Sequence, residues 1–307
     1  MTELAVAGAF AGFLAAAIRV ATPLLLAALG ETIAERAGVI NLGIEGAMLG
    51  GALGAAIGAV TGGPWAGMAA GTLAGTALAG VLAAVAIGAR ADQIITGTAV
   101  TLGAVGLTGA ANRWWFGTAG AGLDVPTLPA LAVPGLASIP VVGPSLFHHP
   151  LPTYVAVAVV PLVGWVLFRT RFGLSLRAAG EAPATAHALG VRVRLVRTAA
   201  VLTGGAFAGL AGATLVLAQV GTFAERMTAG RGFVAIAIVV LGRWHPAGVL
   251  IASLLFGALT ALQYLFQALG LEIPYQLFLM MPYVLTLVAL AGLVGRARPP
   301  AGLARDL

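Results

Sequence analysis

The sequence reads Glu35-Arg36-Ala37-Gly38-Val39-Ile40-Asn41-Leu42-Gly43-Ile44-Glu45-Gly46 where two long apolar runs meet. Asn41 and Glu45 stand four residues apart, a spacing that places both side chains on one face of a helix. A polar side chain in apolar surroundings is costly and is normally turned toward a partner or a cavity. The spacing therefore indicates a hydrogen-bonded pair that locks this helix to a neighbour or, as the sharper alternative, a contact with a substrate.

The composition of the whole chain is also strongly apolar. Its 307 residues are 60% hydrophobic and only 8% charged, whereas a soluble domain is about 25% charged. So few polar side chains cannot cover a globule in water, which excludes a cytosolic protein, a disordered chain and a nucleic-acid-binding domain. The composition predicts an all-α polytopic membrane bundle in which residues 1–307 form one transmembrane domain.

Apolar runs of the length that a membrane-spanning helix needs, about 20 residues, recur along the chain. The first contains Arg19 and Pro23, which predict a kink or a break. The run 231–243 is too short for a straight span and is typical of half of a discontinuous helix. We therefore expect about nine spans, within a range of eight to ten. The candidate runs are 4–29, 39–60, 65–89, 93–112, 151–168, 198–220, 231–243, 247–267 and 275–294.

The placement of the few charges predicts an orientation. Every basic residue is Arg, 16 in all, and the positive-inside rule concentrates such residues in cytoplasmic loops. The loop 169–197 holds six of them against one acid, Glu181, and three more follow the last span, so we expect both regions and the C-terminus inside. The segment 113–150 then lies outside, as a loop or a re-entrant segment. The nine residues are Arg169, Arg171, Arg177, Arg192, Arg194, Arg197, Arg296, Arg298 and Arg305.

Two glycine ladders with a four-residue period follow one another in the second and third runs. In lipid, small residues at this spacing let helix backbones approach closely. The step Gly62-Gly63-Pro64 between the ladders predicts a turn, so we expect a tightly packed hairpin rather than an accident of composition. The ladders are Gly46, Gly50, Gly54, Gly58 and Gly62, then Gly63, Gly67, Gly71 and Gly75.

Residues that enzyme chemistry needs are missing. The sequence has no Lys, which a P-loop places against the nucleotide phosphates, and it has no Cys, no HExxH and no GxSxG. His148 and His149 are adjacent in the 113–150 segment and are better explained as loop residues than as a metal site. We therefore expect no enzyme activity, metal or cofactor in this chain, and any ATP hydrolysis must belong to a partner.

The loop 169–197 contains a compact Ala-rich run that follows Glu181 and Pro183 and ends at Gly190. Acidic residues and Pro suit the first turn of a helix, and Gly suits its C-terminal end. We therefore expect a short helix at about 182–189. Because its residues are Ala rather than Leu or Phe, insertion into a groove of a partner protein is a better explanation than immersion in the membrane surface.

Together these segments resemble a known family, over about 20–295 of the chain. The resemblance is to the permease subunits of ABC importers, within them to the branch of ribose, branched-chain amino acid and nucleoside permeases, and most to the shorter permease of bacterial nucleoside uptake systems. The segments that carry it, besides 35–46, are Arg177-Ala178-Ala179-Gly180-Glu181-Ala182-Pro183-Ala184-Thr185-Ala186-His187-Ala188-Leu189-Gly190-Val191, Asp92-Gln93-Ile94-Ile95-Thr96-Gly97-Thr98-Ala99 and Gly230-Arg231-Gly232-Phe233-Val234-Ala235-Ile236-Ala237.

The resemblance implies a type II ABC importer fold in the bacterial inner membrane. It makes 182–189 the coupling helix that docks on an ABC ATPase subunit. The family loop usually reads Gly-Glu-Asn-Pro, and Ala182 replaces the Asn, which weakens a capping contact. A second, longer permease is implied as heterodimer partner, and a substrate-binding protein or lipoprotein outside. The coupling residues carried over are Gly180, Glu181, Pro183, Ala184, His187 and Gly190.

The expected function is therefore ATP-driven uptake of nucleosides. The alternative cargo is a ribose-like sugar or a branched-chain amino acid, and the alternative class is an ATP-independent channel or carrier. Trp114 and Trp115 are best explained as part of an aromatic belt at the outer interface. By depth and polarity, the candidates for the substrate path are Asn41, Glu45, Gln93, Thr96, Thr98, Thr101, Gln219 and Phe233.

Overall fold

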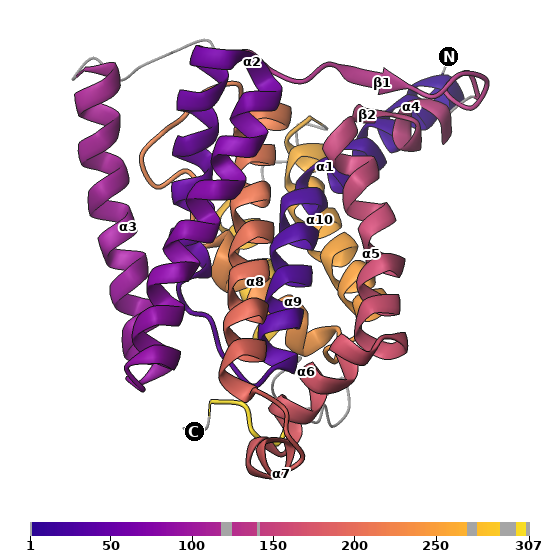
Figure 1. The fold of residues 1–307 in the computed structure, drawn as a ribbon. Helices are drawn as coiled ribbons and strands as arrows, with labels where there is room; N and C mark the ends of the chain where they lie inside the picture. The colour runs from indigo at the N-terminus through magenta and orange to yellow at the C-terminus, as the bar shows by residue number, and fades with distance from the viewer. Residues whose placement is uncertain (1, 118–124, 140–141, 269–274, 289–298, 305–307) are drawn as a thin grey trace.

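The structure is a computed structural model, and it describes residues 2–117, 125–139, 142–268, 275–288 and 299–304. Long helices run side by side along most of its height, and the short helix α7 projects beyond them at one end (Figure 1). This architecture confirms the predicted all-α bundle. The elements are α1 (Thr2–Arg36), α2 (Ile44–Leu82), the π-helical turn η1 (Ala83–Gly88), α3 (Gln93–Phe116), β1 (Ala130–Ala132), α4 (Val142–Leu146), β2 (His148–Pro150), α5 (Leu151–Arg169), α6 (Arg171–Glu181), α7 (Pro183–Ala188), α8 (Val193–Leu215), the π-helical turn η2 (Val216–Val220), α9 (Arg231–Leu241), α10 (Pro246–Ala268) and α11 (Tyr275–Val288).

Six helices among the described residues are long and apolar enough to cross a membrane. One of them, Ile44–Gly88, reverses at Gly63, where φ is +83° and ψ is 175°. The chain therefore turns back at the Gly-Gly-Pro step that the sequence predicts. α9 has 11 residues, as expected for half of a discontinuous helix. The predicted total of nine spans is not confirmed. The six candidates are Gly8–Arg36, Ile44–Gly88, Gln93–Phe116, Leu151–Arg169, Val193–Val220 and Pro246–Gln263.

The first helix is continuous, so the predicted break at Arg19 and Pro23 is wrong, and the alternative of a kink there stays a prediction. α1 runs from Thr2 to Arg36 with Pro23 inside it. Because proline has no N–H, the carbonyl oxygen four residues earlier, that of Arg19, loses its helical partner. The side-chain amide of Gln219, in η2, donates a hydrogen bond to this oxygen. A neighbouring element thus satisfies the backbone group that the proline leaves free, as a helix in lipid requires.

The glycine ladders form the packed hairpin that the sequence predicts, and α8 packs against both of its arms. A Cβ atom added at Gly71 would lie 2.5 Å from the carbonyl oxygen of Gly51 on the other arm. One added at Gly75 would lie 2.5 Å from the carbonyl oxygen of Gly205 on α8. Real Cβ atoms do not come so close to an oxygen, so only glycine permits these backbone contacts.

The segment 169–197 holds two helices where the sequence analysis expects one. α6 spans Arg171–Glu181, and the hydroxyl of Thr170 caps it by accepting a hydrogen bond from the Gly173 N–H at 3.1 Å. α7 (Pro183–Ala188) lies within the predicted range 182–189. An apolar pattern at helical spacing is the sequence signal from which α6 could be predicted. Its buried residues are Gly173, Leu176, Ala179 and Gly180.

The described residues of the 113–150 segment that follow α3, 125–139 and 142–150, lie across the end of the bundle opposite α7 (Figure 1). Its two strands pair antiparallel, with Leu131 opposite His149, and α4 lies between them in the chain. The Val125 N–H donates to the carbonyl oxygen of Gly221, at the end of α8 and η2, at 3.0 Å. The segment therefore folds against the helix ends, and the side of the membrane on which it lies stays a prediction.

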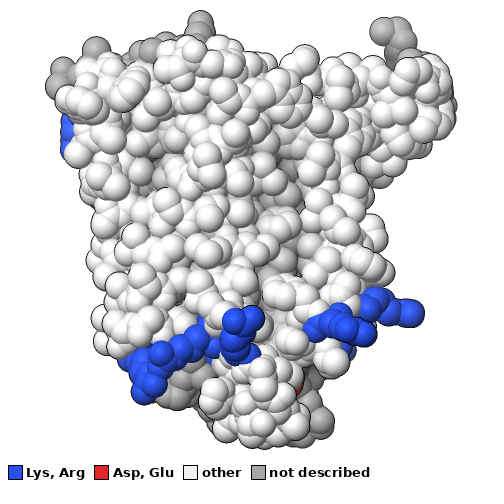
Figure 2. Space-filling model, viewed as in Figure 1, with Lys and Arg blue, Asp and Glu red and all other residues white. Residues whose placement is uncertain are grey.

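Charged side chains are distributed unevenly along the height of the molecule. The face shown in Figure 2 is uncharged over most of its height, and Arg side chains gather near the end where α7 lies. Apolar side chains are exposed on the helices, for example Trp165 at 58% and Leu162 at 54% on α5. One basic end and an apolar flank are expected of a bundle in lipid. The three Arg residues predicted after the last span, Arg296, Arg298 and Arg305, lie outside the described residues.

Candidate functional site

The connection between α1 and α2 is the centre of the candidate site. Residues 37–43 are not helical, and Gly38, at φ +88°, follows the end of α1. Asn41 therefore lies in the connection and Glu45 in the first turn of α2, so the predicted shared helix face is wrong. The physical reason is that the backbone N–H groups of Ile40 and Asn41 donate to side chains of α3 and α1 instead of to carbonyl oxygens of their own helix.

Helix α3 supplies part of this support through the signature that begins at Asp92. The side-chain oxygen of Gln93 accepts a hydrogen bond from the Ile40 N–H at 3.0 Å. The hydroxyl of Thr101 donates to the carbonyl oxygen of Leu42 at 2.8 Å. Asp92 itself caps α3 by accepting from the Ile94 and Ile95 N–H groups. Two predicted path residues, Gln93 and Thr101, thus hold the connection in its extended shape.

Glu45 binds the start of the half-helix α9 and makes no bond to Asn41 in the described structure. Its Oε1 accepts from the Thr228 hydroxyl at 2.6 Å and from the Gly230 N–H at 2.8 Å, and its Oε2 accepts from the Gly232 N–H at 2.6 Å. Unpaired N–H groups and a partial positive charge mark a helix N-terminus. The carboxylate therefore caps α9 from another helix, which is the partner that a charge in hydrocarbon requires.

Asn41 differs from its neighbours because its side chain has no partner among the described residues. The residue is 1% exposed, and both its amide nitrogen and its amide oxygen lack a hydrogen bond there. Its backbone N–H donates to Oε1 of Glu31 at 3.0 Å, and Glu31 Oε2 is also without a partner. A buried amide normally has its hydrogen bonds satisfied. The Asn41 amide, together with Glu31 Oε2, is therefore free to bind a solute or a buried water.

The remaining path candidates are not brought together with Asn41 in the same way. Thr96 is buried on α3, whereas Thr98 is exposed and donates to the carbonyl of Ile94 in its own helix. Phe233 is 47% exposed and follows Gly232 on α9. Gln219 lies toward the opposite end of the bundle, where it serves the Arg19 carbonyl beside Pro23. The structure thus explains Gln219 as a support for α1.

Helix α7 ends as the sequence predicts and begins differently. Gly190, at φ +88°, donates to the His187 carbonyl at 2.9 Å, and Val191 donates to the Ala186 carbonyl at 3.0 Å, which is the Schellman arrangement. Glu181 is the last residue of α6, not part of the first turn of α7, and its carboxylate accepts from the Ala301 N–H at 3.1 Å. The expected role of Glu181 at the N-terminal dipole of α7 is therefore wrong, because α6 ends at Glu181 and α7 begins only at Pro183.

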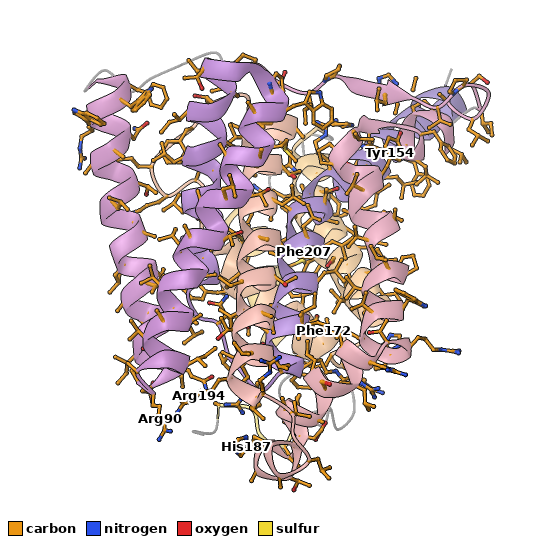
Figure 3. All side chains as sticks on the ribbon, viewed as in Figure 1. Arg90, Tyr154, Phe172, His187, Arg194 and Phe207 are labelled. Atoms are coloured by element: carbon orange, nitrogen blue, oxygen red, sulfur yellow. The ribbon has the colours of Figure 1, made fainter. Side chains whose placement is uncertain are left out.

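Helix α7 has no side-chain cap at its start, and most of its residues are exposed. Ala182 occupies the N-cap position and makes no side-chain capping bond, in line with the expected effect of replacing Asn. Within α7 only Ala186 is buried, while Ala184, Thr185, His187 and Ala188 are exposed. His187 lies on α7 at the end of the molecule that also holds Arg90 and Arg194 (Figure 3).

Three glycines join α7 to the centre of the site. A Cβ atom on Gly38 would lie 3.2 Å from the Cα of Gly180 and 3.1 Å from the carbonyl oxygen of Gly302. The Gly302 N–H donates to the Gly180 carbonyl at 2.8 Å. The guanidinium of Arg197, at the start of α8, donates to the Ala37 carbonyl at 3.1 Å and is 2% exposed. The residues just before α7 are thus packed onto the connection that leads to Asn41 and Glu45.

Several residues of this junction were not among the predicted site residues. Arg197 looked like one more cytoplasmic charge, and Trp244, whose indole N–H donates to Glu35, carried no motif. Thr228 preceded the signature at Gly230 and would have been included by extending that signature two residues. In the described part of the chain, no three His, Cys, Asp or Glu side chains lie close enough to hold a metal ion.

The fold and the site define a class of protein. Apolar spanning helices, a half-helix capped at its N-terminus by a carboxylate, and a short exposed helix at the basic end are features of a membrane permease built from broken helices.

The comparisons identify the family within this class. Residues 5–290 match the family of branched-chain amino acid transport system permease components, and the chain belongs to it. It is 43% identical to a putative glucose ABC transporter permease of Haloferax volcanii, with 86% of this chain and 80% of the relative covered. It is 36% identical to the guanosine permease of Bacillus subtilis and to the nucleoside permease of Lactococcus lactis, with 91% of each chain covered in both cases. No solved structure matches the chain.

Proposed function

We propose that this chain is one permease subunit of an ATP-driven importer and that it carries nucleosides across the plasma membrane. Its family membership supports the permease role, and its relatives of known name are permeases of ABC transporters. In this proposal the ATPase is a separate chain, since a P-loop needs Lys and this sequence has none. A second, longer permease completes the path, a binding protein delivers the solute outside, and the C-terminus lies in the cytoplasm.

The coupling step of this proposal rests on the packing between α7 and the 37–43 connection. α7 is exposed at the basic end, and the residue pair before it, Gly180 and Glu181, contacts the connection and the C-terminal segment. The connection leads to Glu45, which is bonded to the N-terminus of α9. A push on α7 from an ATPase subunit would therefore reach the connection through the backbone contacts of Gly180, and α9 through the buried carboxylate of Glu45.

Bulk on the exposed face of α7 tests the coupling step. We expect Ala184→Trp, and separately Glu181→Ala, to abolish ATP-dependent uptake while membrane insertion stays normal. The measurement is radiolabelled solute uptake in proteoliposomes that contain the whole complex, with protein amount checked in the same vesicles. Ala110→Trp, at an exposed position of α3 away from α7, is the matched control. Uptake that is unchanged in both Ala184→Trp and Glu181→Ala would contradict the coupling assignment.

The solute class rests on the named relatives and on the free amide of Asn41. A side-chain amide can donate and accept at once, which suits the edge of a base or a pair of ribose hydroxyls. Nucleosides and sugars both offer hydroxyls, and the 43% identical relative is a putative glucose permease. A simple sugar is therefore the second candidate, because it is the cargo that this relative's name states.

Competition separates the two cargoes. We expect unlabelled adenosine to suppress the uptake of radiolabelled guanosine by the complex, and glucose, ribose and leucine to leave it unchanged. Asn41→Ala should raise KM about tenfold or more, as the loss of a hydrogen bond to a buried polar partner does. Gln93→Ala serves as the comparison, because the Gln93 side-chain oxygen supports the connection through the Ile40 N–H. Competition by glucose without competition by adenosine would replace the nucleoside proposal with the sugar.

A further inference from the structure

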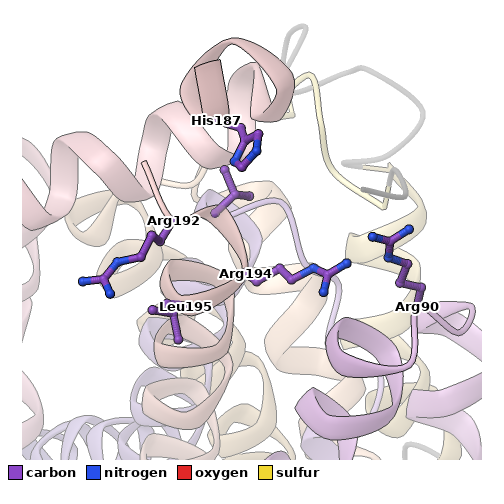
Figure 4. A pocket seen from close by; sticks show the side chains of 6 residues that line it. Arg90, His187, Arg192, Arg194 and Leu195 are labelled. Atoms are coloured by element: carbon purple, nitrogen blue, oxygen red, sulfur yellow. The ribbon is translucent and has the colours of Figure 1, made fainter. Parts of the chain in front are cut away.

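A basic cleft lies beside α7, and His187 is the one residue carried over for coupling that also lines it. It measures about 520 Å³ and is lined by residues from the end of the α2 hairpin, from α7 and from the start of α8. In Figure 4, Arg90 and Arg194 extend toward one another across its mouth, and His187 points into it from α7. The lining residues are Arg90, His187, Arg192, Val193, Arg194 and Leu195.

The charge of the cleft is not neutralised by the acids that the structure describes. Among the described residues, no acid lines the cleft. The salt bridge found in this part of the chain joins Arg113 on α3 to Glu225 in the loop before α9, at 3.2 Å. Asp92 is the acid nearest Arg90 in the chain, and its carboxylate accepts the two capping N–H groups of α3. A cleft lined by three Arg residues, of which Arg90 and Arg194 extend toward one another, therefore favours an anionic occupant.

An apolar groove continues from this cleft along the helices. A second hollow of about 300 Å³ shares Arg194 and Leu195 with the cleft and runs between η1 and α8. It reaches Gly80 on one side and Leu202 on the other, and the eight helical steps from Gly80 to Gly88 cover about 12 Å. Most of its floor is Ala, Gly, Ile and Leu within the segments Ile44–Gly88 and Val193–Val220, which are candidate membrane spans.

We infer that the cleft and groove together bind one anionic phospholipid. The phosphate of the headgroup lies between Arg90 and Arg194, and an acyl chain lies in the groove beside Gly80 and Leu202. Charge alone would also suit an acidic segment of a partner protein. A soluble partner does not reach along a membrane-spanning helix, whereas an acyl chain does, and basic pockets between helices on the cytoplasmic side suit acidic lipid headgroups.

The groove can be filled without disturbing the protein. A Cβ atom at Gly80 would meet only Leu202 Cδ2, at 3.6 Å, which is ordinary contact. Gly80→Leu should therefore occupy the acyl-chain groove and leave the cationic mouth intact. Gly103→Leu is its matched control, since nothing lies within 4 Å of a Cβ atom on Gly103.

The mouth can be tested by removing two charges. Arg90 has φ +58°, so Arg90→Asn is the suitable change, because Asn tolerates this conformation. It is combined with Arg194→Gln, and Arg171→Gln, an exposed residue of α6 at the same end, is the control.

The experiment is native mass spectrometry of the full chain with its associated subunits, titrated with phosphatidylglycerol or with phosphatidylcholine of the same acyl chains. We expect one phosphatidylglycerol to bind more tightly than phosphatidylcholine, and the double Arg variant to bind it about tenfold more weakly or worse. Gly80→Leu should weaken the same binding, while both controls match the wild type.

Four results would overturn the inference. They are equal binding of the two lipids, unchanged phosphatidylglycerol binding in the double Arg variant, full displacement by water-soluble glycerol phosphate, and loss of an associated protein subunit from the double variant with lipid binding retained. The third would indicate a free phosphate site and the fourth a protein-docking site. Lipid binding is measured without transport, so failure of the proposed cargo leaves this test intact.

Discussion

At the scale of the residue, three polar side chains in this protein bond to backbone groups outside their own helix. Glu45 caps α9, Gln93 bonds to the connection before α2, and Gln219 bonds to the carbonyl that Pro23 leaves free. An unpaired backbone group costs several kcal/mol in hydrocarbon, roughly the full cost of desolvating it. A polar side chain within the apolar runs of this chain can therefore mark a place where helical hydrogen bonding is interrupted, and not only a solute path.

Gln219 and Pro23 should form a coupled pair. We expect Gln219→Ala to lower the free energy of unfolding by about 1 kcal/mol, because the Arg19 carbonyl loses its donor. In a Pro23→Ala background the same change should cost almost nothing, since the new alanine would supply the helical N–H. The measurement is a denaturant titration of all four proteins. Thr203→Ala, whose hydroxyl bonds within α8, is the control. Equal costs of Gln219→Ala in both backgrounds would contradict the pairing.

At the scale of the element, a single buried side chain, that of His149, stabilises the strand pair β1–β2. In the 113–150 segment His149 is 1% exposed, and its Nε2 lies 2.7 Å from the Ser145 carbonyl oxygen. Burial lowers the pKa of His149 below its ordinary value, and this outweighs the hydrogen bond to Ser145, which raises it. The ring is therefore neutral near pH 7, and the nitrogen that faces the carbonyl carries the proton.

The strand pair should consequently loosen in acid. The folded pKa of His149 is depressed, so its stabilising contribution is present above the unfolded pKa of about 6.5 and is lost as the pH falls below that value. We expect the protection of the β1 and β2 amides, measured against the intrinsic exchange rate at each pH, to fall between about pH 7 and pH 5. His149→Gln should remove this pH dependence, and His148→Gln, at an exposed position, should keep it. Exchange with the same pH profile in His149→Gln would refute the assignment.

At the scale of the whole molecule, glycine decides how closely the α2 hairpin and α8 approach. Backbone oxygens of one helix lie where a Cβ atom of the next would be, at Gly71 and Gly75. In lipid, close packing replaces the hydrophobic drive that water would supply. The same principle joins Gly38, Gly180 and Gly302 at the end where α7 projects, so the packed core and the proposed coupling route use one type of contact.

A single methyl group should measure this packing. We expect Gly71→Ala to destabilise the protein by about 1–3 kcal/mol, as overpacking of a tight contact does, because the helices must separate. Gly106→Ala on α3 is the control, since its Cβ atom would meet nothing within 4 Å. Thermal unfolding of the detergent-solubilised protein gives the comparison. If the two variants unfold alike, the glycine contacts do not set the helix spacing.

Much of the architecture could be predicted from local pattern. Apolar runs predict the helices, Gly63 predicts the hairpin turn, and Gly190 predicts the end of α7, because each depends on neighbours in the chain. The continuity of α1 could not be predicted, since the donor that compensates Pro23 is 200 residues away along the chain from Arg19. Helix α6 was overlooked although its apolar spacing was present in the sequence.

The candidate site divides in the same way. The sequence by itself determined the class of protein, the lack of a P-loop Lys and the signatures at 35–46, 92–99 and 230–237. Composition and short motifs are local properties of the chain. Only the tertiary structure decided that these signatures meet at one connection, that Glu45 binds α9 rather than Asn41, and that the Asn41 amide stays free. The physical reason is that a buried polar group is satisfied by whichever helix packs beside it, and packing is not encoded in any single segment.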